Sequence, residues 1–286
     1  MKNRAVLITG ATGGIGKAAA IALAKQNFTV IIHGRDKEKT LKVRDEIITI
    51  TGNTDIDILV ADIFLLSNVH GMVYDFKQKY KRLDVLINNA GGIMGKSREI
   101  TTEGLEKTMA VNLFAPYLLT GLLLDLLKES DDGRVINVSS SSHRLNAKPD
   151  FTNLQLTKHY TPLIAYGNAK LFVIWFTRHL QAKLDRQGIG NVTVNVMHPG
   201  AVKTNFGVDS NLGSLLNFIS KLARPFFRTA EKGAETLVYL ATTNGLPAKG
   251  SYYVDRKVAV VSAKYHLPLN EKIVWDYCNA ITGLNL

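Results

Sequence analysis

Short runs of apolar residues recur along this chain, and a longer segment with helical periodicity follows almost every run. Apolar strands of this length suit a sheet buried on both faces, and strands that alternate with helices form parallel sheets. The pattern therefore predicts an α/β fold in which a doubly wound parallel sheet carries helices on both faces. Strands are expected at 6–8, 29–32, 56–60, 85–87, 135–138, 192–196 and 251–254, and helices at 16–25, 37–51, 69–80, 118–128, 163–186 and 230–241.

No repeat, low-complexity segment or linker divides the chain, so one Rossmann-like domain over 1–286 is the simplest prediction. Two segments break the alternation, a long polar one at 141–162 and an amphipathic one at 204–229. Ligands of doubly wound folds bind beyond the carboxyl ends of the strands, and both segments follow strands. We expect 204–229 to form a small lid over a hydrophobic substrate. The alternatives are weak membrane contact through 211–228 and plain packing on the sheet.

Charge and cysteine content limit the kinds of partner. The net charge of +11 arises from 35 basic and 24 acidic residues and fits an anionic cofactor or substrate, an anionic membrane surface or nucleic acid. The basic residues are scattered instead of forming a run, so nucleic acid is not expected and solvated helix faces account for most of them. The single cysteine, Cys278, excludes an internal disulfide and argues against a cysteine-based metal site.

The segment Met1 to Arg4 leads into an apolar run that is far too short for a signal peptide or a membrane span. We also expect no later stretch to reach the roughly 20 apolar residues that a spanning helix needs. These features indicate a cytoplasmic protein, with peripheral membrane contact as the alternative.

A glycine-rich loop joins the first strand to the first helix. Gly10, Gly14 and Gly16 give this loop a spacing that differs from the usual G-x-G-x-x-G. Glycines here permit a tight turn and close approach to a pyrophosphate, and the helix N-terminus adds N–H donors and a positive dipole end. The loop therefore predicts a dinucleotide site.

The second strand ends in Arg35 and Asp36, where this fold meets the adenosine ribose. An acidic residue would accept from the 2′-hydroxyl of NAD, whereas an arginine fits the 2′-phosphate of NADP. Because Arg35 comes first, NADP (NADPH) is favoured over NAD. The alternative is that Arg35 is a solvent-facing charge at a strand end.

Tyr166 and Lys170 are four residues apart in a predicted helix, so their side chains share one face. An ammonium near a phenol favours the phenolate and lowers a pKa that starts near ~10. Such a tyrosine can act as a general acid and base near neutral pH. The spacing alone is common by chance, so it gains weight only from the rest of the chain.

The order of these motifs resembles the short-chain dehydrogenase/reductase family over nearly the whole chain. The family's T-G-x-x-x-G-x-G falls at 9–16, its N-N-A-G at 88–91 and its Tyr-x-x-x-Lys at 166–170. The resemblance implies the catalytic residues Asn112, Ser140, Tyr166 and Lys170. Together the motifs place cofactor contacts at Gly10, Thr12, Gly14, Ile15, Gly16, Arg35, Asp62, Ile63, Asn89, Ala90, Gly91, Tyr166, Lys170, Pro199, Gly200 and Thr204.

The resemblance also implies a role for each catalytic residue. Tyr166 protonates the developing alkoxide in reduction and accepts the hydroxyl proton in oxidation, while Ser140 donates a hydrogen bond to the substrate oxygen. Lys170 binds the nicotinamide ribose, lowers the pKa of Tyr166 and passes a proton to water through Asn112. Ser139 and Ser140 point to opposite faces of a strand, so only one faces the nicotinamide, and the motif favours Ser140.

Two histidines, His143 and His159, lie in the insertion near the site. Neither has a metal-ligand partner at a useful spacing, so we expect structural or solvated histidines and no metal.

Within the family the chain looks most like the retinol dehydrogenase branch. The evidence is the gap of 26 residues between Ser140 and Tyr166, the Arg-Asp pair at 35–36 and the His-Pro-Gly at 198–200. The resemblance implies an NADP-dependent oxidoreductase that interconverts a hydrophobic alcohol and its aldehyde or ketone. The alternatives are a cofactor-binding regulatory or scaffold protein without turnover, and a peripheral membrane enzyme acting on a lipid-dissolved carbonyl. Many family members pair through the helix at 163–186, so a monomer and a homo-oligomer both fit.

Overall fold

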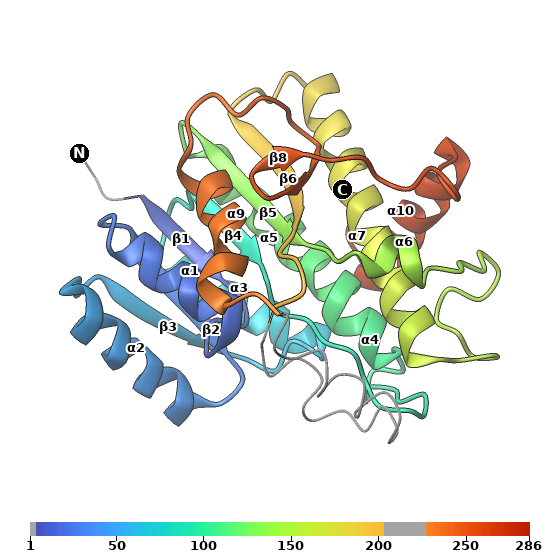
Figure 1. Ribbon diagram of the computed structural model, residues 1–286, viewed down its shortest axis with the longest axis horizontal. Coiled ribbons are helices and arrows are strands. Elements are labelled where there is room, and N and C mark those ends of the chain that lie inside the picture. The colour runs from blue at the N-terminus through green and yellow to red at the C-terminus, as the bar shows by residue number, and fades with distance from the viewer. Residues whose placement is uncertain (1–3, 203–226) are drawn as a thin grey trace.

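The computed structural model describes residues 4–202 and 227–286, and a sheet of eight strands lies at its centre (Figure 1). The strand order is β3-β2-β1-β4-β5-β6-β7-β8, in which all pairs are parallel except β7 with β8. The order reverses between β1 and β4, which is the switch point where doubly wound folds bind ligands. The predicted α/β fold is confirmed. The strands are β1 (Ala5–Ile8), β2 (Thr29–Gly34), β3 (Ile56–Val60), β4 (Val85–Asn88), β5 (Gly133–Val138), β6 (Val192–His198), β7 (Tyr252–Val254) and β8 (Lys257–Val258).

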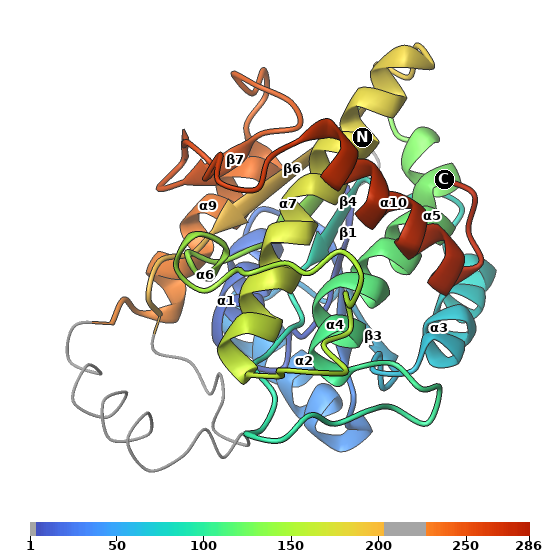
Figure 2. The ribbon, with the colours of Figure 1, turned by 90° about the vertical axis from the view of Figure 1, so that its right-hand side faces the viewer.

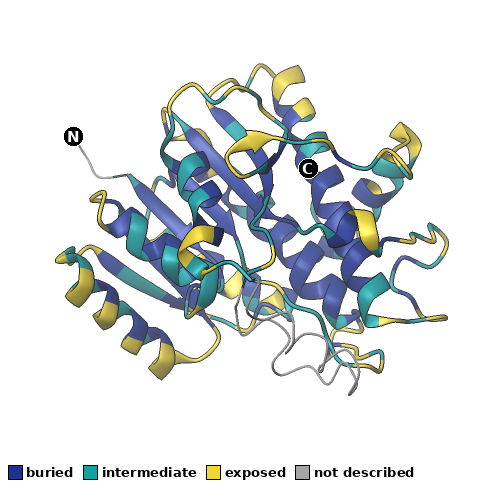
Figure 3. Ribbon diagram, viewed as in Figure 1, coloured by how far each residue is buried: buried dark blue, intermediate teal, exposed yellow. Residues whose placement is uncertain are grey.

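Helices cover both faces of the sheet, and each face has its own hydrophobic core. Val6 and Ile8 of β1 pack on the side of α1, α2 and α9, whereas Leu7 packs on the side of α3, α5 and α7. This alternation is the two-residue period of a strand. The central strands are buried on both faces and are mostly dark blue in Figure 3. The helices are α1 (Gly14–Ala24), α2 (Lys37–Thr51), α3 (Leu66–Lys79), α4 (Lys107–Met109), the π-helical turn η1 (Ala110–Phe114), α5 (Ala115–Lys128), α6 (Ser142–Leu145), α7 (Pro162–Arg186), α9 (Ala230–Thr242) and α10 (Pro268–Thr282).

Helix α7, which carries the Tyr-Lys pair, begins where its sequence provides a cap. The Thr161 hydroxyl accepts from the main-chain N–H of Ile164 at 3.2 Å, and Pro162 fills the first turn, where no N–H is needed. The helix therefore starts within one residue of the predicted position, and its start sets which residues face the sheet.

Helix α10 and strand β8 were not predicted. Helix α10 runs beside α7 and α5 (Figure 2), and its buried residues Val274, Trp275, Cys278 and Thr282 follow helical spacing. Ile273, Tyr277 and Ile281 are partly buried beside this stripe and pack on the same core. Part of the α7 surface is thus covered by α10.

One described helical stretch, Lys107–Lys128, is long and apolar enough to cross a membrane by length and composition. The prediction that no stretch would reach this length was therefore wrong. In the fold 72% of its most apolar window is buried, because the stretch forms α4, η1 and α5 against the sheet. Core helices of globular domains have the same composition.

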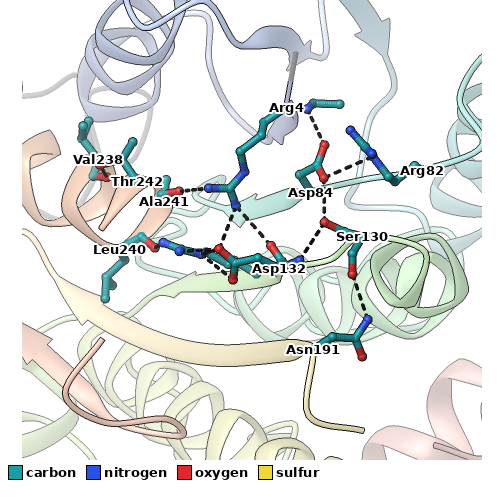
Figure 4. Close-up of polar contacts among 12 residues, drawn as sticks. Arg4, Arg82, Asp84, Ser130, Asp132, Asn191, Val238, Leu240, Ala241 and Thr242 are labelled. Atoms are coloured by element: carbon teal, nitrogen blue, oxygen red, sulfur yellow. Dashed lines mark hydrogen bonds and ion pairs between the residues drawn. The ribbon is translucent and has the colours of Figure 1, made fainter. Parts of the chain in front are cut away.

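Polar residues lock the amino edge of the sheet, opposite the expected site (Figure 4). The carboxylate of Asp84 accepts from the main-chain N–H of Ala5 at 2.7 Å and from the Ser130 hydroxyl at 2.6 Å. The Arg134 guanidinium donates to the carbonyl of Leu240, in the last turn of α9, at 2.8 Å. Satisfied polar groups hold this edge together, and the carboxyl edge carries the predicted site residues.

Candidate active site

The glycine loop has little room for side chains at Gly16 and is open at Gly13. Gly10 and Gly14 have φ of +64° and +54°, the left-handed region that favours glycine. A Cβ at Gly16 would lie 2.5 Å from Nδ2 of Asn89 and 2.6 Å from the carbonyl of Gly10. A Cβ at Gly13 would meet nothing within 4 Å. Main chain at the start of α1 is therefore open to a ligand, which fits the phosphates of a dinucleotide.

The N-N-A-G segment, residues 88–91, is hydrogen-bonded to the start of this loop. The Thr9 hydroxyl accepts from the main-chain N–H groups of Asn89 and Ala90, both at 3.0 Å. The Asn89 amide donates to the carbonyls of Thr9 at 2.8 Å and Gly10 at 3.2 Å. Asn89 was predicted to contact the cofactor, and the structure places its side-chain amide against the main chain of the glycine loop.

His33 is a site residue that the sequence analysis missed. The main-chain N–H of Gly10 donates to Nδ1 of His33 at 3.2 Å, so Nε2 carries the hydrogen and donates to the carbonyl of Ala61 at 3.0 Å. Burial lowers the pKa of His33, which keeps the neutral ring that this arrangement needs. Residue spacing could not predict these hydrogen bonds of His33, because Gly10 and Ala61 lie on two other segments of the chain.

A cavity of about 540 Å³ lies beside the loop at the end of β2. The carboxylate of Asp36 accepts from the main-chain N–H of Lys39 at 2.7 Å and caps α2. The acidic residue at this position is thus engaged by the helix, while Arg35 lines the cavity. Its lining residues are Thr12, Arg35, Asp36, Glu38, Lys39 and Lys42.

Asn112 lies in η1, where the helix widens by one residue per hydrogen bond. Its Oδ1 accepts from the N–H of Gly92 at 3.1 Å, and its Nδ2 donates to the carbonyls of Gly92 at 2.8 Å and Thr108 at 2.7 Å. A Cβ at Gly91 would lie 2.5 Å from Oδ1 of Asn112 and 3.2 Å from Nζ of Lys170. Asn112 and Lys170 therefore flank Gly91, as the family motifs imply.

Lys170 is almost fully buried, and its Nζ donates to the carbonyl of Val138 at 2.9 Å. Burial lowers the pKa of Lys170 to about 7. A lysine with this pKa can gain and lose a proton near neutral pH, which an ordinary surface lysine does not do.

Residues 139 and 140 face different partners. The Ser139 hydroxyl donates to the carbonyl of Lys170 at 2.8 Å. The Ser140 hydroxyl accepts from the main-chain N–H of Ser142 at 3.2 Å and forms a side-chain hydrogen bond with Tyr166. The structure thus brings Ser140, and not Ser139, to the tyrosine.

Burial raises the pKa of Tyr166, and the hydrogen bond from Ser140 opposes this effect only in part. The expected lowering by Lys170 is not found, because its ammonium points to the Val138 carbonyl and lies 5.5 Å from the centre of the tyrosine ring. The phenol is therefore held protonated, as a proton donor must be before it reacts.

Residues 4–213 match the family model for short chain dehydrogenases. The chain belongs to this family. Human (Homo sapiens) retinol dehydrogenase 11 is 36% identical over 285 residues, covering 99% of this chain and 87% of that protein. Human polyprenol dehydrogenase is 34% identical over 294 residues, covering 99% and 86%. A solved structure of an uncharacterized protein from Mycobacterium paratuberculosis has a TM-score of 0.77 and 27% identity, covering 99% of this chain and 94% of that one.

This short-chain dehydrogenase is thus an oxidoreductase of CH–OH groups, with a nicotinamide cofactor and a small-molecule substrate. It lies in the retinol dehydrogenase branch, since retinol dehydrogenases 11, 12 and 14 are among its relatives.

The other predicted residues that the structure describes lie in turns that follow strands of the sheet. Asp62 is exposed in the turn after β3, where it accepts from the N–H of Phe64 at 3.2 Å, and Ile63 is buried beside it. Gly200 has φ of +83° after Pro199, in the turn that follows β6. Thr204 and the lid at 204–229, up to residue 226, lie outside the described residues.

A second cavity, of about 750 Å³, lies between α7 and α10. Arg178, His179 and Trp275 are among its lining residues, and none of the predicted site residues is. This cavity therefore lies apart from the predicted site residues.

Proposed function

We propose that this dehydrogenase interconverts a hydrophobic alcohol and its aldehyde or ketone with NADP as cofactor. The observation that carries the proposal is the contact of Ser140 with Tyr166, one helical turn from the buried Lys170. We also propose that residues 1–286 form one domain, with 204–229 as a lid over the substrate.

Each residue has one task in this proposal. Tyr166 gives its proton to the substrate oxygen in reduction and takes it back in oxidation, and Ser140 donates a hydrogen bond to the same oxygen. Lys170 returns the proton toward solvent, which its lowered pKa of about 7 favours. Asn112 holds the main chain at Gly92 beside Lys170. The bound nicotinamide would supply or accept the hydride.

The proposed cofactor site uses main chain and charge. The open main chain at Gly13 and the start of α1 would hold the phosphates. Arg35 would bind a 2′-phosphate, and the engagement of Asp36 in the α2 cap supports NADP over NAD. The site would be completed by Thr12, Gly14, Ile15, Asp62, Ile63, Ala90, Gly91, Pro199, Gly200 and Thr204.

A hydrophobic substrate fits the relatives, because retinol and polyprenol are both apolar alcohols. The apolar residues of 204–229 support the same proposal through the sequence. We propose a cytoplasmic enzyme, and the alternative is a peripheral membrane enzyme that takes its substrate from the bilayer.

The test is a panel of apolar and polar carbonyls and alcohols, read by NADPH absorbance, with the wild-type chain and Tyr166→Phe. Turnover of apolar substrates that is lost in Tyr166→Phe, with NADPH binding retained, is the expected result. Tight NADPH binding without turnover across the panel would instead favour a regulatory protein. Flotation with anionic vesicles separates the soluble from the peripheral enzyme.

A further inference from the structure

His143 follows Ser140 by three residues and contacts its carbonyl oxygen twice. The main-chain N–H of His143 donates to it at 3.2 Å, and the ring Nδ1 approaches it to 2.6 Å. A carbonyl oxygen can only accept, so Nδ1 carries the hydrogen and Nε2 of the neutral ring does not. The ring thus donates a short hydrogen bond to the residue that meets Tyr166.

The imidazole is fixed from its other side by the sheet. It is buried, and its ring meets Tyr252 of β7 edge-on, with centroids 5.1 Å apart and planes at 71°. Tyr252 is itself buried and pairs with Val196 of β6. The ring therefore cannot leave Ser140 without disturbing this packing.

The charges around the ring keep it neutral. Burial lowers the pKa of His143, the hydrogen bond to Ser140 opposes this, and Arg144 of α6 and Arg178 of α7 lower it further. His198 of β6 is also near, and burial lowers the pKa of His198 to about 4. The ring is thus in the form that the hydrogen bond to Ser140 uses.

Within residues 4–202 and 227–286, Nε2 of His143 is buried and makes no hydrogen bond. The bond to the Ser140 carbonyl is therefore the one hydrogen bond that this ring makes to the described residues. Buried polar groups are usually hydrogen-bonded, and here only one ring nitrogen of His143 has a partner among the described residues. The hydrogen bonding of this ring is therefore directed at Ser140.

Ser140 is held both at its main-chain carbonyl and at its side-chain hydroxyl. His143 holds the carbonyl on one side, and the N–H of Ser142 donates to the hydroxyl oxygen at 3.2 Å on the other. With the oxygen engaged as an acceptor, the hydroxyl hydrogen is left to point at Tyr166.

We propose that His143 is a positioning residue that acts through the Ser140 carbonyl and keeps the Ser140 hydroxyl directed toward Tyr166, where the substrate oxygen would bind. This inference rests on the proposed function in so far as Ser140 takes part in turnover. His143 itself touches neither substrate nor cofactor in this proposal.

The test compares three variants of the full chain. His143→Phe keeps a ring against Tyr252 and removes the donor, whereas His143→Asn places an amide N–H at the position of Nδ1. His159→Asn is the matched control, because His159 is an exposed histidine of the same insertion with φ of +58°, which asparagine tolerates.

Two readouts are taken on each variant: amide hydrogen exchange at Ser142, whose N–H reports the Ser140 hydroxyl, and kcat with NADPH affinity. In His143→Phe we expect exchange at Ser142 to rise and kcat to fall, each by about tenfold, with unchanged NADPH affinity. His143→Asn should restore both, and His159→Asn should match the wild type.

Unchanged exchange and unchanged kcat in His143→Phe would overturn the inference. Equal losses in His143→Phe and His143→Asn, with a lowered Tm in both, would show a packing role and also overturn it. If the wild type turned over no substrate, the proposed function would fail, and exchange at Ser142 would still decide the role of His143.

Discussion

The Ser139 hydroxyl donates to the carbonyl of Lys170, 2.8 Å away, and so joins the strand that leads to Ser140 to the helix that carries Tyr166. Neighbouring serines thus have separate tasks, because one fixes the two elements together and the other meets the tyrosine. Stability and turnover of variants at the two serines can therefore distinguish their roles.

Ser139→Ala should lower the free energy of unfolding by about 0.5–1.5 kcal/mol, because it removes the buried hydrogen bond between this segment and α7. Ser140→Ala should leave stability nearly unchanged and lower kcat by about 100-fold, as expected for a lost donor to a developing charge. Denaturant titration and steady-state kinetics of both variants check this. The reverse pattern would mean that Ser139 is the reacting serine.

Arg35→Ala should weaken NADPH binding by about 10- to 100-fold, since a charge-assisted contact contributes about 1.5–3 kcal/mol. NADH, which lacks the 2′-phosphate, should lose less than about twofold by the same argument. Titration calorimetry with both cofactors makes the comparison. Arg44→Ala is the matched control, because Arg44 lies on α2 and pairs with Asp45. Equal losses for both cofactors in Arg35→Ala would refute the proposed contact.

His33→Phe should weaken NADPH and NADH alike, because it removes the acceptor that fixes Gly10 in the phosphate loop. The unsatisfied main-chain N–H of Gly10 should also cost about 1–3 kcal/mol of stability. Affinities for both cofactors and chemical denaturation give the two values. Wild-type affinity for both cofactors would show that the loop holds its shape without His33.

Acid should destabilise the dehydrogenase through its buried histidines. Burial lowers the pKa of His198 to about 4 and also lowers the pKa of His33 and His143, whereas an unfolded histidine titrates near ~6.5. The unfolded state then binds more protons between these values, so stability is complete above about pH 6.5 and falls toward pH 4.

His198 alone can account for up to about 3 kcal/mol of this loss. The measurement is the free energy of unfolding from pH 8 to about 4 in the wild type and in His198→Asn. A smaller slope in the variant supports the assignment. Identical slopes would mean that other groups carry the acid dependence.

The sequence predicted the sheet and the helices that position the site, because strand and helix periods are local properties of the chain. It also placed Ser140, Tyr166 and Lys170, which the fold brings together through α7 and the end of β5. It missed His33, whose partners are set by strand pairing, and it predicted the opposite direction for the pKa of Tyr166. Burial decides that pKa, and burial depends on packing that no spacing expresses.

Helix α10 also bears on how the chain reaches its native state during synthesis. It follows every other described element, and Trp275 packs edge-on against Tyr117 of α5 and stacks on His179 of α7. While a ribosome is still making residues 268–282, the surface that α10 will cover on α5 and α7 faces water. A nascent chain at that stage presents this apolar surface to chaperones. The surface becomes covered once residues 268–282 have been made and α10 has packed on it.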